Sequence, residues 1–267
     1  MTIGQRLGGP LARAIGRRLV REGGVIAAAF TPASLFTSGI VGAWSDRISL
    51  ADLWTDIGRT TNVTAAGQFV ASWRVNTSSG PIYMQQANAN QRPSYQVDGN
   101  GVGHLLFDGA DDRMDSSVTF ALSGNTESTL MVAADHEGSF AVNKGYITHY
   151  AATVGNASRV LGQNADGTMR VDVVGQNVVG PSIPTTFAVL EAKFGGTEIA
   201  AAVNGGAFTT ATGVTINTLN NQALTLGQGA AAQFANYRCY GFVHIVRALT
   251  TQERANLVAW MTALGNP

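Results

Sequence analysis

The sequence predicts an all-β fold, an antiparallel sandwich of two sheets, with an N-terminal arm before it and one helix at its C-terminal end. Three observations support this prediction. Short segments of strand composition recur along residues 69–246, separated by clusters of Gly, Asn, Asp and Ser. An Asn-Gly pair lies between two of these segments, and a single helix signature stands out near the C-terminus. Such spacing is typical of a sandwich or a barrel, and not of alternating strands and helices.

The expected strands are short and apolar, as strands that face a core must be. They are Phe69–Val75, His104–Phe107, Ser128–Ala134, Met169–Val174, Phe187–Phe194, Ile199–Val203, Ala223–Leu226 and Tyr237–Val246. After the sixth of these, Asn204 and Gly205 supply the positive φ angles of a tight turn. The sequence therefore predicts a β-hairpin between Ile199–Val203 and Ala207–Thr210.

The helix is expected over residues 250–264. Thr250 and Glu253 have the spacing of a capping box, in which each side chain binds the backbone N–H of the other residue. Gly265 marks the end of the helix. An apolar stripe runs along one side of it: Leu257, Val258, Met261 and Leu264.

A separate unit precedes the sandwich. Residues 1–29 hold five arginines and one glutamate, a net charge of +4, and residues 30–267 hold 12 basic and 16 acidic residues, a net charge of −4. Apolar residues recur every four positions in this arm, as on one face of a helix. Gly8, Gly9 and Pro10 interrupt the pattern, so a helix is expected from about Pro10 to about Arg21. The candidate anchoring residues are Ile3, Leu7, Leu11, Arg13, Ile15, Arg17, Arg18 and Leu19.

We expect the arm to be an attachment device that docks against another chain, while docking on its own body stays open. Each apolar side chain contributes about 1.5–3 kcal/mol when fully buried. Five of them offset only part of the cost of ordering roughly twenty residues, at about 1–2 kcal/mol per residue, so the arginines are expected to add charge-assisted hydrogen bonds to the partner. No apolar segment of suitable length follows the arginines, so a secretion signal is not expected. The apolar side carries no Trp or Phe, which argues against a membrane-surface helix.

Composition excludes several classes of protein. The 267 residues carry 17 basic and 17 acidic side chains, so neither nucleic acid nor an anionic membrane is an expected partner. Hydrophobic residues make up 45% and charged residues 13%, which excludes disorder. A single cysteine excludes a disulfide framework and any cysteine-based zinc site. The longest apolar runs are far too short to span a bilayer.

Several runs of residues resemble concanavalin A-like (laminin-G-like) jelly-roll domains, which are common in bacteriophage and prophage virion proteins. The resemblance covers roughly residues 30–264, leaves the arm outside, and is looser over residues 45–47 and 72–83. The runs that carry it are Phe30–Phe36, Gly42–Asp46, Leu53–Asp56, Gln91–Tyr95, Leu106–Asp112, Val203–Gly205, Leu224–Gly227 and Phe242–Thr250. It implies two units, an anchoring arm at 1–29 and a jelly-roll domain at 30–267.

The resemblance also implies a function. We expect a non-enzymatic virion protein, a capsid decoration, minor capsid or tail accessory protein, whose arm contacts other virion proteins and which self-associates. Binding of a host-surface glycan is left open. The alternative is a free bacterial protein that binds or cleaves carbohydrate. Because this sandwich hosts lectins, hydrolases and structural modules alike, the fold alone does not decide between these functions.

No catalytic residue or cofactor is predicted. Glycoside hydrolysis needs two carboxylates across one bond, and the Glu-x-Asp-x-x-Glu motif of hydrolases that resemble this fold is absent. Glu191 is the glutamate inside a clear apolar strand, where it is expected to share a solvent-exposed face with Lys193. The four histidines are scattered without metal-ligand spacing. His244 alternates with apolar residues and is expected on the outer face of a sheet or at an interface, and Cys239 is expected to be buried.

Two groups of residues are candidates for ligands. Asp108, Asp111 and Asp112 belong to the densest acidic cluster and could offer oxygens to Ca²⁺, but their spacing matches no calcium loop, so a turn is the preferred interpretation. Trp54 could stack on a sugar ring and is the one candidate glycan-binding residue. Trp44 is expected in the core.

Overall fold

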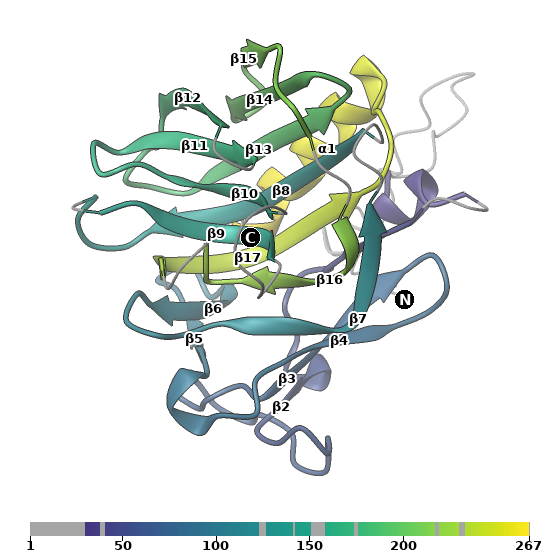
Figure 1. The fold of residues 1–267 in the computed structure, drawn as a ribbon. Helices are drawn as coiled ribbons and strands as arrows, with labels where there is room; N and C mark the ends of the chain where they lie inside the picture. The colour runs from purple at the N-terminus through teal and green to yellow at the C-terminus, as the bar shows by residue number, and fades with distance from the viewer. Residues whose placement is uncertain are drawn as a thin grey trace, which may run out of the picture.

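A computed structural model describes residues 30–37, 41–122, 127–140, 142–150, 158–173, 176–216, 219–229 and 233–266 of the chain. Within this part, antiparallel strands form a single hydrogen-bonded system that folds into two facing layers, the sandwich predicted from the sequence (Figure 1). The anchoring residues of the arm, from Ile3 to Leu19, lie outside the described residues.

The first layer, sheet A, holds the C-terminal strand near its middle. Its strands run in the order β5-β6-β17-β8-β13-β14-β15, and β1 pairs with the end of β17. Their bounds are β1 Gly42–Trp44, β5 Ser94–Val97, β6 Gly103–Asp108, β8 Ser128–His136, β13 Ala188–Gly195, β14 Glu198–Val203, β15 Thr209–Thr212 and β17 Asn236–Ile245.

The second layer, sheet B, runs in the order β2-β3-β4-β7-β16-β9-β10-β11-β12. Its strands are β2 Leu53–Trp54, β3 Ser72–Thr77, β4 Ile82–Gln85, β7 Met114–Leu122, β9 Lys144–Tyr150, β10 Ser158–Gln163, β11 Thr168–Val173, β12 Gln176–Ser182 and β16 Leu219–Leu226. The described residues also form three short 3-10 helices: η2 Pro32–Leu35, η3 Leu50–Asp52 and η4 Ala89–Gln91.

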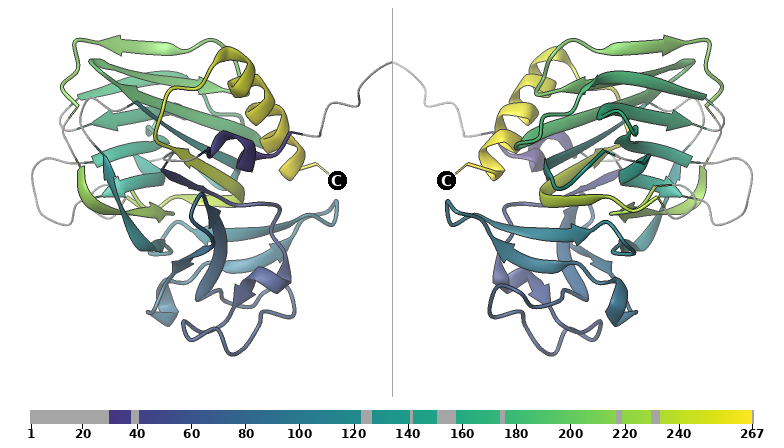
Figure 2. Two further views of the ribbon diagram at one scale, coloured as in Figure 1. Left: turned by 90° about the vertical axis from the view of Figure 1, so that its right-hand side faces the viewer. Right: turned by 90° about the vertical axis from the view of Figure 1, so that its left-hand side faces the viewer.

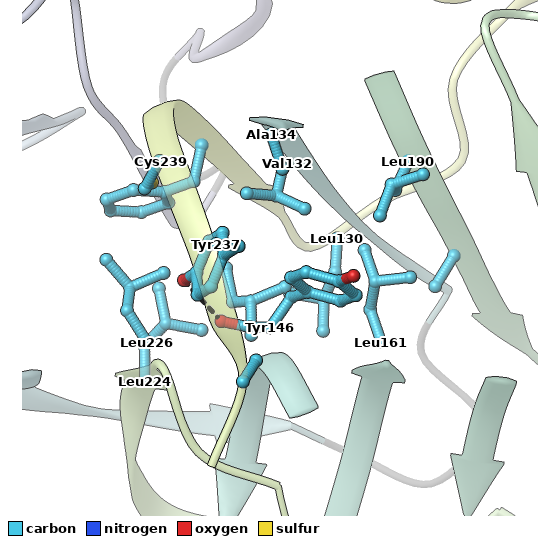
Figure 3. Packing of buried hydrophobic residues seen from close by; sticks show 14 of the residues in the cluster. Leu130, Val132, Ala134, Tyr146, Leu161, Leu190, Leu224, Leu226, Tyr237 and Cys239 are labelled. Atoms are coloured by element: carbon cyan, nitrogen blue, oxygen red, sulfur yellow. Dashed lines mark hydrogen bonds between the residues drawn. The ribbon is translucent and has the colours of Figure 1, made fainter. Parts of the chain in front are cut away.

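The main core lies between the two sheets and follows from the period-two alternation of the strands. Along β8 the side chains of Leu130, Val132 and Ala134 point inward, and along β17 those of Tyr237 and Cys239 do the same, all at most 3% exposed. Figure 3 shows these residues packed with partners from sheet B. The prediction that Cys239 is buried is confirmed.

A second core lies on the other side of sheet A, beneath the helix α1, Thr251–Leu264. The capping box is present, because the Thr250 side chain accepts from the N–H of Glu253 and the Glu253 carboxylate accepts from the N–H of Thr250. Leu257 and Met261 pack on outward residues of β8, β13 and β17. Figure 2 shows α1 in yellow beside η2 in purple, both on this face. Among the described residues, no helix is long and apolar enough to cross a membrane.

The predicted hairpin is the β14–β15 connection. Asn204 and Gly205 have φ angles of 51° and 73°. The N–H of Gly206 donates to the carbonyl oxygen of Val203 at 3.0 Å, closing the turn. An Asn and a Gly are the residues that tolerate these positive angles, which is why this turn could be read from the sequence.

Candidate functional site

The outer face of sheet A is covered over only part of its area. Met131, Ala133 and Val243 lie under α1 and are buried there. The remaining area is formed by β5, β6, the beginning of β17 and the end of β8, which lie side by side in Figure 1. We call this area the open face of sheet A. Its side chains are largely polar, which is what alternation produces when one side of a strand faces a core and the other faces water.

A cleft of about 530 Å³ lies on the open face. Its lining comes from strands and loops far apart in the sequence, and consists of Gln96, Val97, Asp98, Gly99, His104, Leu106, Asp108, Glu137, Asn236 and Arg238. Register places many of these side chains in rows across the strands. One row runs through Ser94, Leu106, Arg238 and Asp135, and its neighbour pairs Gln96 with His104.

Arg238 occupies the centre of this floor. Its guanidinium forms ion pairs with Asp135, at 3.5 Å, and with Glu137. Burial raises the pKa of Asp135, and the facing Arg238 opposes that rise. One cation is thus shared by two carboxylates, and the three side chains hold one another at the floor of the cleft.

Asp98 and Tyr240 fix the wall of the cleft next to β5. The Tyr240 hydroxyl donates to an Asp98 carboxylate oxygen at 3.2 Å, and the N–H groups of Asn100 and Val102 donate to the other oxygen at 2.8 and 2.9 Å. Burial works against ionisation, yet these hydrogen bonds hold the pKa of Asp98 below its usual range. His104 lies 5.3 Å from the Tyr240 ring, between ring centroids. Burial lowers the pKa of His104, so its ring is neutral at pH 7.

An exposed aromatic ring borders the open face. Phe69 forms an antiparallel bridge with Ser94, so its side chain lies on the same side of the sheet as the row through Leu106 and Arg238. Phe69 is 59% exposed, the largest value among the large apolar side chains that the structure describes as exposed. An apolar ring beside a polar floor is a common composition for a small-ligand site.

Trp54 lies elsewhere. It belongs to β2 in sheet B, is half-buried, and packs edge-on against Tyr83 with ring centroids 5.9 Å apart. It takes no part in the cleft on sheet A. Trp44 is buried and stacked on Phe36 at 4.4 Å, as expected of a core residue.

The acidic cluster forms a turn between β6 and β7. The Asp108 carboxylate accepts from the N–H of Ala110 at 2.8 Å, and the Asp112 carboxylate accepts from the N–H of Asp108 at 2.9 Å. These contacts match the preferred interpretation from the sequence. Carboxylate oxygens of Asp108, Asp111 and Asp112 also lie within 4.8 Å of one another. Hydrogen bonds within the turn account for this proximity.

The expectation for Glu191 is wrong. Glu191 and Lys193 do share the outer face of sheet A, but Glu191 is 1% exposed, because the beginning of α1 covers it. Arg254 of α1 donates from Nε to the two carboxylate oxygens at 2.9 and 2.8 Å. Burial raises the pKa of Glu191, and Arg254 opposes that rise. This pair borders a smaller cleft of about 260 Å³.

The expectation for His244 is also wrong. His244 is fully buried and points between the sheets, where its Nε2 lies 3.2 Å from Nε2 of His149. Both rings meet Phe120 edge-on. Burial lowers the pKa of His149 to about 3 and that of His244 well below its usual value, so the pair is neutral. Neighbouring residues of a strand face opposite sides of the sheet. Because Val243 faces α1, His244 faces the other sheet.

Sequence reasoning did not identify the cleft residues Gln96, Arg238 or Glu137 as a group. They belong to β5, to β17 and to the loop after β8, and single-sequence patterns do not reveal which strands pair. One available signal was the alternation of Arg238 with Tyr237 and Cys239, which marks its side chain as facing away from the core.

Comparisons with known proteins identify the fold and nothing finer. No family model matches the chain, and no curated protein matches it. A Trypanosoma rangeli sialidase structure superposes with a TM-score of 0.57 at 12% identity, over 86% of this chain and 34% of the sialidase. Domain 4 of AbnA, a GH43 extracellular arabinanase from Geobacillus stearothermophilus, superposes with a TM-score of 0.51 at 14% identity, over 82% of this chain and 99% of that domain. The chain thus spans about a third of the sialidase chain, and the likeness is one of β-sandwich architecture.

Proposed function

We propose that this chain is a carbohydrate-binding domain and that the cleft on the open face of sheet A holds the sugar. The observation that carries the proposal is the composition of the open face: the cleft is lined by planar hydrogen-bonding side chains, and the row through Leu106 and Arg238 continues across Ser94 to the exposed ring of Phe69. Strands hold such side chains at defined spacing, so a rigid ligand can contact several of them at once.

Sugar chemistry matches this composition. Each sugar hydroxyl is both a donor and an acceptor, and it pairs with groups that accept, donate or do both. Glu137 and Asp98 accept, Arg238 donates, and the amides of Gln96 and Asn236 do both. The less polar side of a sugar ring packs on an aromatic face, and Phe69 offers one at the border.

The fold comparison adds support. Domain 4 of AbnA, nearly all of which superposes on this chain, was solved in complex with arabinotriose. A domain of this architecture therefore accommodates an oligosaccharide. Which sugar fits here is decided by the residues of this chain, because only 14% of positions are identical.

We propose binding without turnover. A general acid or base must exchange protons with its substrate, whereas Asp135 and Glu137 are both engaged by Arg238. The virion role remains a separate prediction, since the arm that motivates it lies outside the described residues.

The experiment is a glycan-array screen of the full chain, followed by calorimetry on each sugar that binds. Replacing Phe69 by Ala removes an exposed ring and is expected to weaken binding about twofold to twelvefold, from an aromatic contribution of about 0.5–1.5 kcal/mol. Trp54→Ala is the matched control, since it truncates the aromatic residue on the other sheet and is expected to leave affinity unchanged. Loss of binding in Trp54→Ala with none in Phe69→Ala would move the site to β2, and absence of any bound glycan would overturn the proposal.

A further inference from the structure

The cleft on sheet A carries an excess of negative charge. Asp98, Asp108, Asp135 and Glu137 line or border it, and Arg238 is the one cationic side chain among its described lining residues. Four carboxylates minus one guanidinium give a formal charge of −3, with His104 neutral. Neighbouring charges of one sign in a concave surface reinforce one another and attract a cationic partner.

The opposite charge is concentrated in one segment of the same chain. Residues 1–29 carry Arg6, Arg13, Arg17, Arg18 and Arg21 against Glu22, a net charge of +4, although the whole protein is neutral. A guanidinium binds a carboxylate through two parallel hydrogen bonds, so arginine-rich segments suit carboxylate-lined surfaces.

The chain enters the described domain on the same side of sheet A as the cleft. Phe30 packs on the second core, together with α1 and Leu249, and η2 follows directly. Figure 2 shows η2 beside α1 on this face. A stretch of 29 residues spans about 95 Å when extended, and a domain of this size has a radius of gyration of about 18 Å. The arm is therefore long enough to reach the cleft of its own chain.

We propose that the basic arm, residues 1–29, docks in the acidic cleft of its own chain and competes there with other ligands. Charge complementarity favours this face as the docking site, because the cleft supplies the carboxylates and the arm supplies the arginines. The docking itself is independent of carbohydrate binding; its regulatory consequence, that the arm must leave before a sugar enters, rests on the proposed function. An arm held by exposed ion pairs is released by salt, because such pairs are screened.

Hydrogen–deuterium exchange of the full chain tests the docking. We expect backbone amides of β5 and of Asp98–Gly103 to exchange about tenfold faster when Arg13, Arg17 and Arg18 are all replaced by Glu, since three exposed pairs are together worth about a factor of ten. A variant with Lys at the same three positions keeps the charge and is the matched control, with exchange close to that of the original chain. Raising salt from 0.05 to about 1 M should release the original chain and leave the Glu variant unchanged.

Two outcomes overturn the proposal. Equal exchange in the original chain and the Glu variant would show that the arm does not dock here. Protection that increases with protein concentration would show that the arm of a second copy occupies the cleft. Sugar affinity, measured on the same variants, separates the two proposals. If exchange changes but no sugar binds, the docking proposal is supported and the proposed function is refuted.

Discussion

Replacing Glu191 by Gln should destabilise the protein strongly, although this residue lies outside the proposed cleft. The Glu191 side chain is 2% exposed, and its carboxylate is held by Arg254 of α1, whose side chain is 21% exposed. Removing one partner of a buried ion pair costs about 3–5 kcal/mol, because the other charge stays buried without compensation. Arg254 keeps its hydrogen bond to the Gly206 carbonyl and its contact with Phe208. The lower end, about 3 kcal/mol, is therefore expected.

Thermal and denaturant unfolding measure this loss. For a chain of this size, about 3 kcal/mol corresponds to a fall in Tm of roughly 6–12 °C. Glu198→Gln is the matched control: it makes the same change on the neighbouring strand, where the Lys193–Glu198 pair is about one-third exposed. Exposed pairs contribute about 0–1 kcal/mol, so this variant should stay within a few degrees of the original.

The pH dependence provides a second check. Arg254→Met leaves Glu191 buried without a cation, which raises its folded-state pKa further above the unfolded value. A raised carboxyl pKa lowers stability as pH rises through the window between the unfolded and folded pKa values. The loss in Arg254→Met should therefore nearly vanish near pH 4, where Glu191 is uncharged in both proteins. A loss below about 1 kcal/mol in Glu191→Gln at pH 7, or a loss in Arg254→Met that stays the same from pH 7 to pH 4, would refute the reasoning.

Three further predictions concern the core, the sheet contact and the arm. The folded-state pKa of buried His149 is about 3. Each pH unit below about 6.5 therefore removes about 1.4 kcal/mol of stability per buried neutral histidine. The double variant His149→Leu, His244→Leu should show a smaller loss of stability with falling pH, and an unchanged slope would contradict this. Gly145→Ala places a Cβ 2.2 Å from the Gly229 Cα atom, and overpacking of this kind costs about 1–3 kcal/mol by denaturant unfolding, so a loss well below 1 kcal/mol would show that the backbone gives way. Deleting residues 1–29 should leave a folded domain whose Tm falls by no more than about 6 °C, since the docked arm contributes about 1.4 kcal/mol at most. The deletion should also abolish assembly into any particle that the full chain joins. Unfolding of the truncated protein would place the arm in the core.

Local signals predicted local structure well. Asn204-Gly205 makes a hairpin because its conformational preference is satisfied within four residues, whatever the rest of the chain does. Thr250 and Glu253 form the capping box for the same reason. The burial of Cys239 also followed from its neighbours, because alternation in an apolar strand sorts residues between two faces.

Alternation did not say what covers each face. Glu191 and Lys193 were placed correctly on one side of β13, but the sequence could not show that α1 lies over the first of them. His244 failed for the related reason that both faces of β17 are buried where α1 covers the sheet. Predicting the cleft would also have required the strand order, because Gln96 and Arg238 come together only through the pairing of β5, β6 and β17. Strand order is a property of the whole chain, which explains why local patterns did not reveal it.

The position of β17 has a consequence for synthesis of the protein. β17 is the last strand of the chain, yet it lies between β6 and β8. On the ribosome, β8 ends about a hundred residues before β17 begins, a delay of roughly 5–20 seconds at typical elongation rates. Throughout that interval the facing edges of β6 and β8 have no partner, and unpaired edges are templates for association with other chains. Sheet A is thus completed only after translation is nearly finished, so chains that terminate before residue 236 should aggregate, and slow release or early termination should lower the yield of folded protein.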